Sequence, residues 1–189
     1  MDKIQTFVEV ILALALIILM IPIIFIISCF IKVTSTGPVF YWSDRVGKEN
    51  KIFSMPKFRT MSIKTPQVAT HVLENPSNFY TPIGNVLRKY SLDEIPQLIS
   101  IVKGDMRFVG PRPALFNQLD LINLRRELGI HKMTPGITGW AQVNGRDEIS
   151  INFKVKLDQE YLNKKSIKFD LYILFLTLYK VIRKEGISH

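Results

Sequence analysis

Hydrophobic residues gather first at the start of the chain, where no charged residue occurs from Val10 to Ile31. A run of this length is enough for a helix to cross the roughly 30 Å hydrocarbon core of a bilayer. The run is longer than the apolar region of a secretory signal peptide, and no small-residue cleavage site precedes Lys32. The pattern therefore predicts a membrane segment over residues 1–33 that stays attached to the chain.

Pro22 stands in the middle of this run. A proline inside a helix removes one backbone donor, here to the carbonyl of Ile18, and clashes with that turn, so a bend is expected. Membrane helices nevertheless tolerate proline. Hydropathy therefore leaves two topologies open: a single tilted span, and a bent helix that turns back to the face it entered.

Cationic residues are unequally distributed about the apolar run. Lys3 alone precedes it, whereas four cations soon follow it, at Lys32, Arg45, Lys48 and Lys51. The positive-inside rule then places the following domain in the cytoplasm, and it does so for either topology.

The remaining residues, 34–189, amount to about one domain of roughly 150 residues. Short apolar or aromatic runs at 38–42 and 51–58 are separated by the polar segment 46–50, which predicts a β-hairpin. Residues 65–80 are polar, contain two prolines and show no clear period, so a surface loop is expected there.

Helical periodicity dominates the second half of the chain. Helices are expected at about 83–89, 94–103, 114–128 and 152–163, and a stretch rich in glycine and proline runs from 134 to 146. Residues 171–179 are almost wholly apolar but too short to span a bilayer, so they should lie in the core or at the membrane interface. The fold class expected is α/β, a mostly helical membrane-associated domain with a short β-hairpin.

Composition narrows the range of partners. The formal net charge is +9 and 47% of residues are hydrophobic, which excludes disorder and points to anionic partners such as phospholipid, nucleotide phosphate or nucleic acid. Cys29 is the only cysteine, so an intrachain disulfide or a cysteine-rich metal site is excluded.

Two adjacent carboxylates, Asp93 and Glu94, form the first candidate site. They could simply begin a helix, with Ser91 and Glu94 as a capping box or Asp93 as the N-cap. Alternatively, a carboxylate there could attack phosphorus or hold Mg²⁺ while its neighbour performs the other task. Two adjacent anions repel unless a cation lies between them.

Three basic segments could supply such cations. In 103–113, prolines on both sides of Arg112 fix the backbone around a guanidinium, the side chain best suited to clamp a phosphate with two hydrogen bonds. In 134–146, glycines would let backbone amides approach an anion beside Arg146. Lys57 and Arg59 alternate on a predicted strand and should face the same side. Taken singly, each segment could equally be a turn or a solvated edge.

Taken together, these segments resemble the bacterial sugar transferases, and more narrowly the small monotopic phosphoglycosyl transferases. The resemblance runs in order from the apolar segment to the end of the chain, leaving nothing for a second soluble domain. It is carried by residues 57–61 (KFRTM), 91–97 (SLDEIPQ), 104–113 (GDMRFVGPRP), 135–139 (PGITG) and 142–146 (QVNGR).

The resemblance implies an enzyme that transfers a sugar-1-phosphate from a UDP-sugar to a polyprenol phosphate such as undecaprenyl phosphate, releasing UMP. This reaction starts the assembly of a surface glycan or a glycoprotein oligosaccharide. It implies that Asp93 is the nucleophile and forms an aspartyl-phosphosugar intermediate, with Mg²⁺ held by Asp93 and Glu94. A carboxylate nucleophile would split the reaction between two poorly miscible anions into two steps.

The resemblance also assigns further residues. Phosphate-binding positions fall on Lys57, Arg59, Arg88, Arg112 and Arg146, and supportive positions on Pro113, Gln142 and Asp158. It implies a re-entrant helix-break-helix bent at Pro22, in the bacterial inner membrane, with the catalytic domain on the cytoplasmic face. This chain departs from the familiar pattern at Ile21 and Arg107, where serine is common.

Two other classes compete with this interpretation. A membrane-anchored adaptor for RNA or anionic lipid would explain the charge but would give the carboxylates no task with Arg112. A phosphohydrolase acting on polyprenyl diphosphates would use the same cations but pass the phosphoryl group to water. We expect a transferase with membrane lipid and no nucleic acid as partners. The sugar and the oligomeric state, including a homo-oligomer, stay open.

Overall fold

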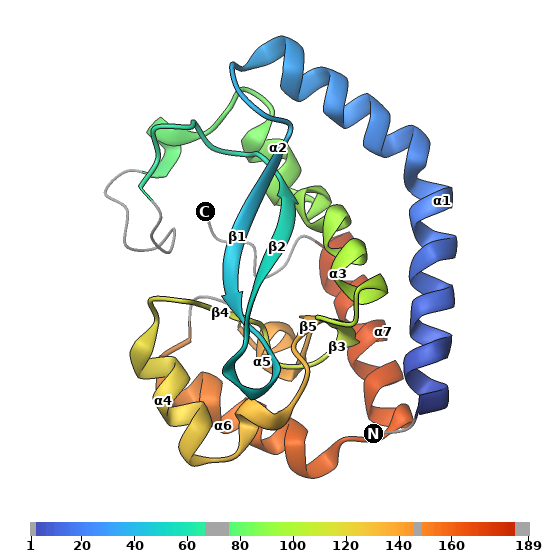
Figure 1. Cartoon of the computed structure of the whole chain (residues 1–189), viewed down its shortest axis with the longest axis vertical. Coiled ribbons are helices and arrows are strands. Elements are labelled where there is room, and N and C mark those ends of the chain that lie inside the picture. The colour runs from blue at the N-terminus through green and yellow to red at the C-terminus, as the bar shows by residue number, and fades with distance from the viewer. Residues whose placement is uncertain (1–2, 67–75, 146–148, 184–189) are drawn as a thin grey trace.

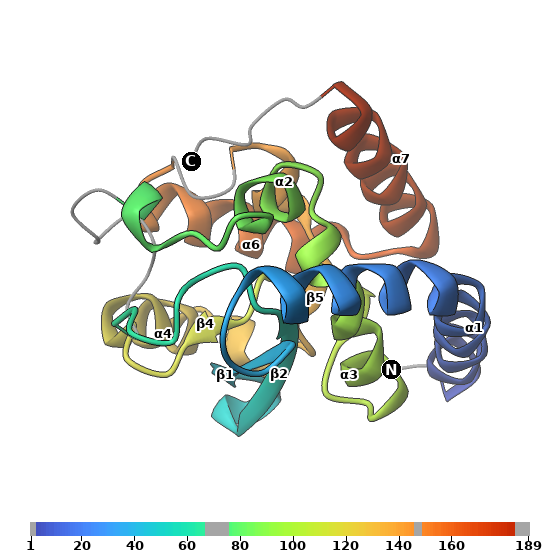
Figure 2. The same cartoon turned by 90° about the horizontal axis from the view of Figure 1, so that it is seen from above.

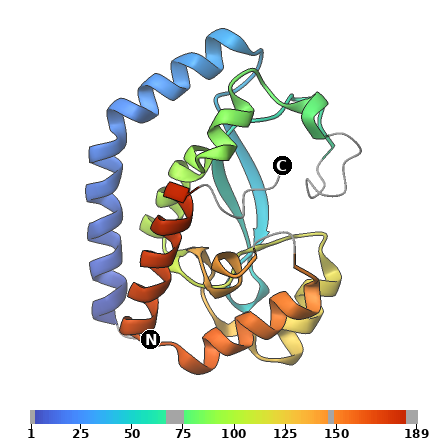
Figure 3. The same cartoon turned by 180° about the vertical axis from the view of Figure 1, so that it is seen from behind.

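The computed structural model describes residues 3–66, 76–145 and 149–183, and its architecture is shown in Figure 1. One long helix, α1 (Lys3–Thr34), runs along the edge of a mixed α/β body. Pro22 lies inside this helix, and Figures 1 and 3 show the helix bending on its way from its N-terminal arm to its C-terminal arm. The predicted bend is therefore present.

Both arms of α1 pack against the same body. Ala13 is buried against Met55 and Leu98, and Ile31 is buried against Phe58 and Leu87. Most other apolar side chains of α1 are exposed, and only 11% of the residues in its most apolar stretch are buried. Within the described residues, α1 is the one helix long and apolar enough to cross a membrane. The chain thus has the features of a membrane protein.

Two buried arginines form hydrogen bonds at the two ends of α1. Arg107, 4% exposed, donates from Nε and Nη2 to the carboxylate of Glu9 on the N-terminal arm. At the other end, the Arg59 guanidinium donates to the carbonyls of Ser35, Thr36 and Pro38 as the chain leaves the helix. Each arm therefore has a charged attachment besides its apolar contacts.

The first sheet has the strand order β2-β1-β4. Strands β1 (Phe40–Val46) and β2 (Ile52–Phe58) are antiparallel, and the connection contains a 3-10 helix, η1 (Lys48–Asn50). The predicted hairpin is confirmed. Strand β4 (Ala114–Leu115) pairs with the end of β1, so the helix predicted over 114–128 is wrong in its first part: α4 covers Leu119–Glu127.

The second sheet pairs β3 (Arg107–Val109) in parallel with β5 (Gly136–Thr138). A Cβ on Gly136 would lie 2.1 Å from the backbone nitrogen of Gly110, so only glycine allows this approach. The glycine- and proline-rich segment thus includes a buried strand and continues into helix α5 (Trp140–Val143).

The other helices follow the predicted periodicity with some differences. Helices α2 (Gly84–Lys89) and α6 (Ile151–Lys164) match their predictions. The helix expected at 94–103 is divided into the 3-10 helix η4 (Leu92–Gln97) and α3 (Leu98–Val102). Short 3-10 helices also occur at η3 (Pro76–Phe79) and η5 (Ile130–Lys132). Residues 67–75 of the expected loop lie outside the described residues.

Helix α7 (Ile167–Arg183) is longer than its predicted apolar centre. It lies on the same side of the molecule as the N-terminal arm of α1 (Figure 2). Many of its large apolar side chains are exposed: Ile167, Leu171, Tyr172, Phe175, Leu178, Tyr179 and Ile182. Its other side packs in the core, where Ile173 is fully buried in a cluster with Val109 and Tyr161. Part of the predicted segment 171–179 therefore lies in the core, and its remaining apolar side chains are exposed.

Candidate active site

Asp93 and Glu94 lie side by side on η4, which packs against β2. Lys57 reaches them from the end of β2, with its Nζ 3.0 Å from Glu94 Oε1 and 4.0 Å from Asp93 Oδ2. Arg112 approaches from the loop between β3 and β4 and places Nη2 2.9 Å from the same Glu94 oxygen. The adjacent anions thus have cations between and beside them, as the sequence reasoning required.

Burial sets the electrostatics of this cluster. It raises the pKa of the Asp93 carboxyl, an effect that Lys57 opposes and that the neighbouring Glu94 reinforces. Burial also lowers the pKa of the Lys57 ammonium, while Glu94 opposes that change. Both groups are less stable in their charged forms than they would be in water. A phosphate or cation added here would therefore interact strongly with them, because the buried site screens charge poorly.

Arg88 belongs to the same cluster. Its charge acts to lower the pKa of Asp93, and its guanidinium lies over the Tyr80 ring, 5.2 Å from the ring centroid. Stacking on an aromatic face orients a guanidinium while leaving hydrogen-bond donors for other partners. Together with Lys57 and Arg112, Arg88 surrounds the carboxylate pair with positive charge.

Arg59 is not part of this cluster, and the expectation that it faces the same side as Lys57 is wrong. Strand β2 ends at Phe58, so the alternation of side chains no longer holds at Arg59. Its buried guanidinium serves the carbonyls that follow α1. In this structure Arg59 is an attachment point for the membrane helix.

Ser91 does not form the capping box with Glu94 that was one of the alternatives from the sequence. Ser91 adopts a left-handed conformation with φ 53°, and its side chain makes no capping hydrogen bond to η4. The carboxylates of Asp93 and Glu94 therefore lie among cations instead of stabilising a regular helix start.

The supportive residues have hydrogen-bond partners outside the carboxylate pair. Asp158 is 1% exposed and accepts hydrogen bonds from Arg125 at 2.6 and 3.0 Å. The Pro113 carbonyl accepts from Arg45, and Gln142 donates to the Ile137 carbonyl at 3.0 Å. Arg146 lies outside the described residues.

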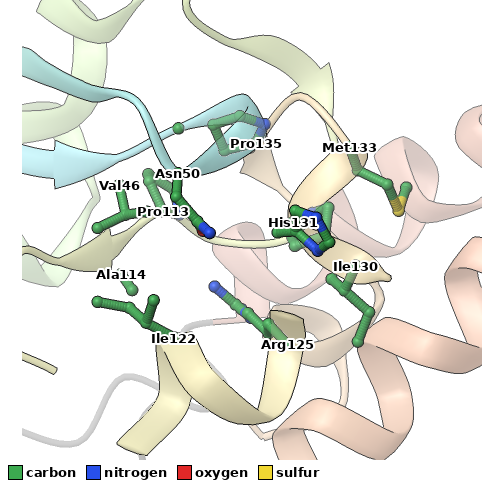
Figure 4. Close-up of a pocket in the computed structure, with 12 residues that line it drawn as sticks. Val46, Asn50, Pro113, Ala114, Ile122, Arg125, Ile130, His131, Met133 and Pro135 are labelled. Atoms are coloured by element: carbon green, nitrogen blue, oxygen red, sulfur yellow. The ribbon is translucent and has the colours of Figure 1, made fainter. Parts of the chain in front are cut away.

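A cavity of about 30 Å³ is lined in part by Pro111 and Pro113, and neither Asp93 nor Glu94 is among its lining residues. Figure 4 shows that its walls include Arg125, His131 and Asn50. This volume holds about one water molecule and is far too small for a sugar nucleotide. The carboxylate cluster is therefore the stronger candidate for the reaction site.

A model of the bacterial sugar transferase family matches residues 1–184. The chain belongs to the bacterial sugar transferase family. Because the match includes both the apolar segment and the carboxylate cluster, the resemblance noted from the motifs is confirmed.

Curated relatives of this transferase come from several bacteria. This chain is 41% identical over 152 residues to the uncharacterized sugar transferase EpsL of Bacillus subtilis, and the match covers 80% of this chain and 74% of that protein. It is 37% identical over 180 residues to the UDP-glucose:undecaprenyl-phosphate glucose-1-phosphate transferase of Escherichia coli, covering 91% of this chain but 39% of that protein. It is 34% identical over 194 residues to the exopolysaccharide production protein ExoY of Rhizobium meliloti, covering 94% and 85%. These relatives support a transferase enzyme and give the hydrolase and adaptor alternatives no support.

The transferase has two adjacent carboxylates that could bind a divalent cation. Within the part of the chain that the structure describes, no group of three or more His, Cys, Asp or Glu side chains converges. Mg²⁺ is usually held by one or two carboxylates together with substrate phosphate oxygens, so Asp93 and Glu94 fit such an ion.

Sequence reasoning did not single out Glu9 or Arg125, and it used Arg45 only as a topology signal. The only sequence signal for Glu9 is that a carboxylate borders an apolar segment, where an ionised group is costly without a partner. Arg125 stands beside a second arginine, Arg126, and nothing in the sequence distinguishes the buried one from the exposed one.

Proposed function

We propose that this transferase moves a sugar-1-phosphate from a UDP-sugar to a polyprenol phosphate, undecaprenyl phosphate in bacteria, with release of UMP. The observation that carries the proposal is the buried Asp93 carboxylate, held among Lys57, Arg88 and Arg112 beside Glu94. The names of the E. coli, Aeromonas hydrophila and Salmonella typhimurium relatives, all of which act on undecaprenyl phosphate, support the acceptor. Such a reaction is the first membrane step of glycan assembly.

Asp93 is the proposed nucleophile. Its carboxylate oxygen attacks the phosphorus that bears the sugar, the bond from that phosphorus to the bridging oxygen breaks, and UMP leaves with the electron pair. A phosphate oxygen of the polyprenol phosphate then attacks the same phosphorus. The acyl phosphate bond breaks, Asp93 regains its carboxylate, and polyprenyl diphosphate sugar is released.

Lys57 and Arg112 have the task of offsetting negative charge on the diphosphate as UMP departs. In the structure both contact the same oxygen of Glu94, at 3.0 and 2.9 Å. Glu94 thus holds both cations close to Asp93 before any substrate arrives, so little reorganisation is needed when the donor binds. Arg88 adds further positive charge near Asp93.

Mg²⁺ is the proposed cofactor, with Asp93 and Glu94 as its protein ligands. When bound, it would offset charge on the diphosphate and on the leaving UMP.

We expect EDTA to abolish UMP release and Mg²⁺ to restore it. Glu94→Gln should raise the Mg²⁺ concentration for half-maximal rate by about tenfold or more, because a neutral amide is a poorer ligand. Titration of Mg²⁺ in the UMP assay measures this shift. The matched control is Glu127→Gln, an exposed glutamate on α4. An unchanged Mg²⁺ requirement in Glu94→Gln would remove Glu94 from the metal site.

We further propose that α1 is re-entrant and that both of its ends lie on the cytoplasmic face of the inner membrane. Three observations support this: α1, which contains Pro22, is bent; both of its arms pack on one body; and Glu9 forms a buried ion pair with Arg107. In a straight span, Glu9 would be separated from that body by the bilayer.

Cysteine labelling tests this topology. In a Cys29→Ser background, a cysteine at the exposed Ile4 should resist a membrane-impermeant maleimide added outside spheroplasts, and it should react after permeabilisation. The control is a cysteine at Val33, the other exposed end of α1, which is cytoplasmic in both topologies. Labelling of the Ile4 cysteine from outside would establish a single span.

The reaction itself is tested by incubating the purified protein with Mg²⁺, polyprenol phosphate and, in turn, UDP-linked glucose, galactose, N-acetylgalactosamine and a bacillosamine-type sugar. UMP formed over many turnovers when the lipid is present, and at no more than about one equivalent per enzyme without it, supports transfer. Inorganic phosphate released from polyprenyl diphosphate would instead indicate a hydrolase, and the absence of either product with all donors would contradict the proposal.

A further inference from the structure

The backbone of Pro111, Arg112 and Pro113 is held through its carbonyl oxygens. Two of these three residues are prolines, so Arg112 has the only backbone N–H of the triplet. The Pro111 carbonyl accepts a hydrogen bond from the Gly136 N–H at 3.0 Å. The other two carbonyls accept from arginine side chains: that of Arg112 from Arg125 at 2.7 Å, and that of Pro113 from Arg45 at 3.2 Å.

Arg125 is the more deeply fixed of these two arginines. It extends from α4 toward the loop that carries Pro113 (Figure 4) and is 8% exposed. Its Nε and Nη2 both donate to Asp158 Oδ2, at 3.0 and 2.6 Å, which leaves Nη1 to donate to the Arg112 carbonyl. Asp158 therefore sets the plane of the guanidinium, and the guanidinium sets the position of the Arg112 main chain.

The same arginine 112 carries the side chain that meets Glu94 in the carboxylate cluster. A continuous series of hydrogen bonds thus connects Asp158 on α6 with Glu94 on η4, through Arg125 on α4 and then through both the carbonyl and the guanidinium of Arg112. Every member of the series has a charge or a carbonyl dipole, so each contact is of the stronger, charge-assisted kind.

We infer that Arg125, oriented by Asp158, is a positioning residue for the transfer reaction and acts by fixing the main chain of Arg112. This inference rests on the proposed function, since its effect is read in the rate of transfer. If Arg125 acts by positioning Arg112, replacing Arg125 should lower the transfer rate only while residue 112 is still arginine. If Arg125 instead contributes generally to folding, its replacement should lower the rate equally in either background.

The test is a double-variant cycle measured by UMP release with a UDP-sugar that the unmodified protein accepts. Arg125→Lys keeps a charge for Asp158 but cannot donate to Asp158 and to the Arg112 carbonyl in the same planar geometry. We expect kcat/KM to fall about tenfold or more in the otherwise unmodified protein, and by less than about threefold when Arg112 is already lysine. Arg126→Lys, the exposed neighbour on α4, is the matched control and should leave the rate unchanged.

Equal losses in the two backgrounds, or no loss in the first, would overturn the inference. Should Arg125→Lys not fold, as judged by thermal denaturation, Asp158→Asn is used instead, because it keeps Arg125 and removes only the charge that orients it. The same dependence on Arg112 is expected. Absence of UMP release by the unmodified protein would instead count against the proposed function, so the two failures are distinguishable.

Discussion

Asp93→Asn is expected to reduce transfer by at least about 10³-fold, because the amide cannot act as the nucleophile and no other carboxylate occupies its position. Incubating the unmodified protein with Mg²⁺ and UDP-sugars, without lipid, should give a mass increase of one sugar phosphate located on Asp93. The same incubation of Asp93→Asn should give no increase. UMP release and intact-protein mass spectrometry together measure the effect.

The stability of Asp93→Asn distinguishes a catalytic from a structural role. Burial raises the pKa of Asp93 in the fold, so the protein binds this proton more tightly when folded than when unfolded. Above the raised pKa, the ionised carboxylate therefore lowers the stability of the fold, and a neutral Asn removes that cost. We expect the Tm at pH 8 in EDTA to be unchanged or higher.

Asp44→Asn is the matched control, since Asp44 is an exposed aspartate on β1. It should change neither the rate nor the adduct. A folded Asp93→Asn protein with near-normal turnover would eliminate Asp93 as the nucleophile. A large drop in its Tm would show that the carboxylate is structural.

Arg112→Lys should lower kcat/KM by about 10²- to 10³-fold, the usual cost of removing a preorganised donor from a developing negative charge. The lysine keeps the charge but offers a single point of contact in place of a planar fork. Steady-state UMP release at saturating Mg²⁺ measures the change.

The Tm of Arg112→Lys should change little, because the Arg112 side chain is partly exposed and lysine can still approach Glu94. Arg126→Lys repeats the substitution on an exposed arginine and should have no effect on rate. A kcat/KM close to that of the unmodified protein would show that a point charge suffices and that no bidentate clamp operates.

Several features of the fold could be predicted because their causes are local. The hairpin follows from apolar runs on both sides of the polar segment 46–50, and α6 follows from its helical periodicity. The structure adds that Ser150 caps α6 by accepting a hydrogen bond from the Phe153 N–H. The helix predicted over Ala114 and Leu115 is wrong because their pairing partner, β1, lies about 70 residues earlier in the sequence. The side predicted for Arg59 is wrong because alternation along a strand does not indicate where the strand ends.

The sequence by itself determined the membrane segment, the bend expected at Pro22, and the motifs that place the chain among the sugar transferases. These depend on local hydrophobicity, on backbone chemistry and on residue order, all of which are visible along the chain. It also assigned Asp93, Glu94, Lys57, Arg88 and Arg112, which the structure brings together.

Only the tertiary structure decided which charged residues become partners. Glu9 and Arg107 are 98 positions apart, and Arg125 and Asp158 are 33 apart. A buried charge must have a partner because desolvation is costly, but packing alone selects which partner it meets. For the same reason the adjacent arginines 125 and 126, indistinguishable in sequence, are separated by the fold into one that holds the Arg112 carbonyl and one that faces water.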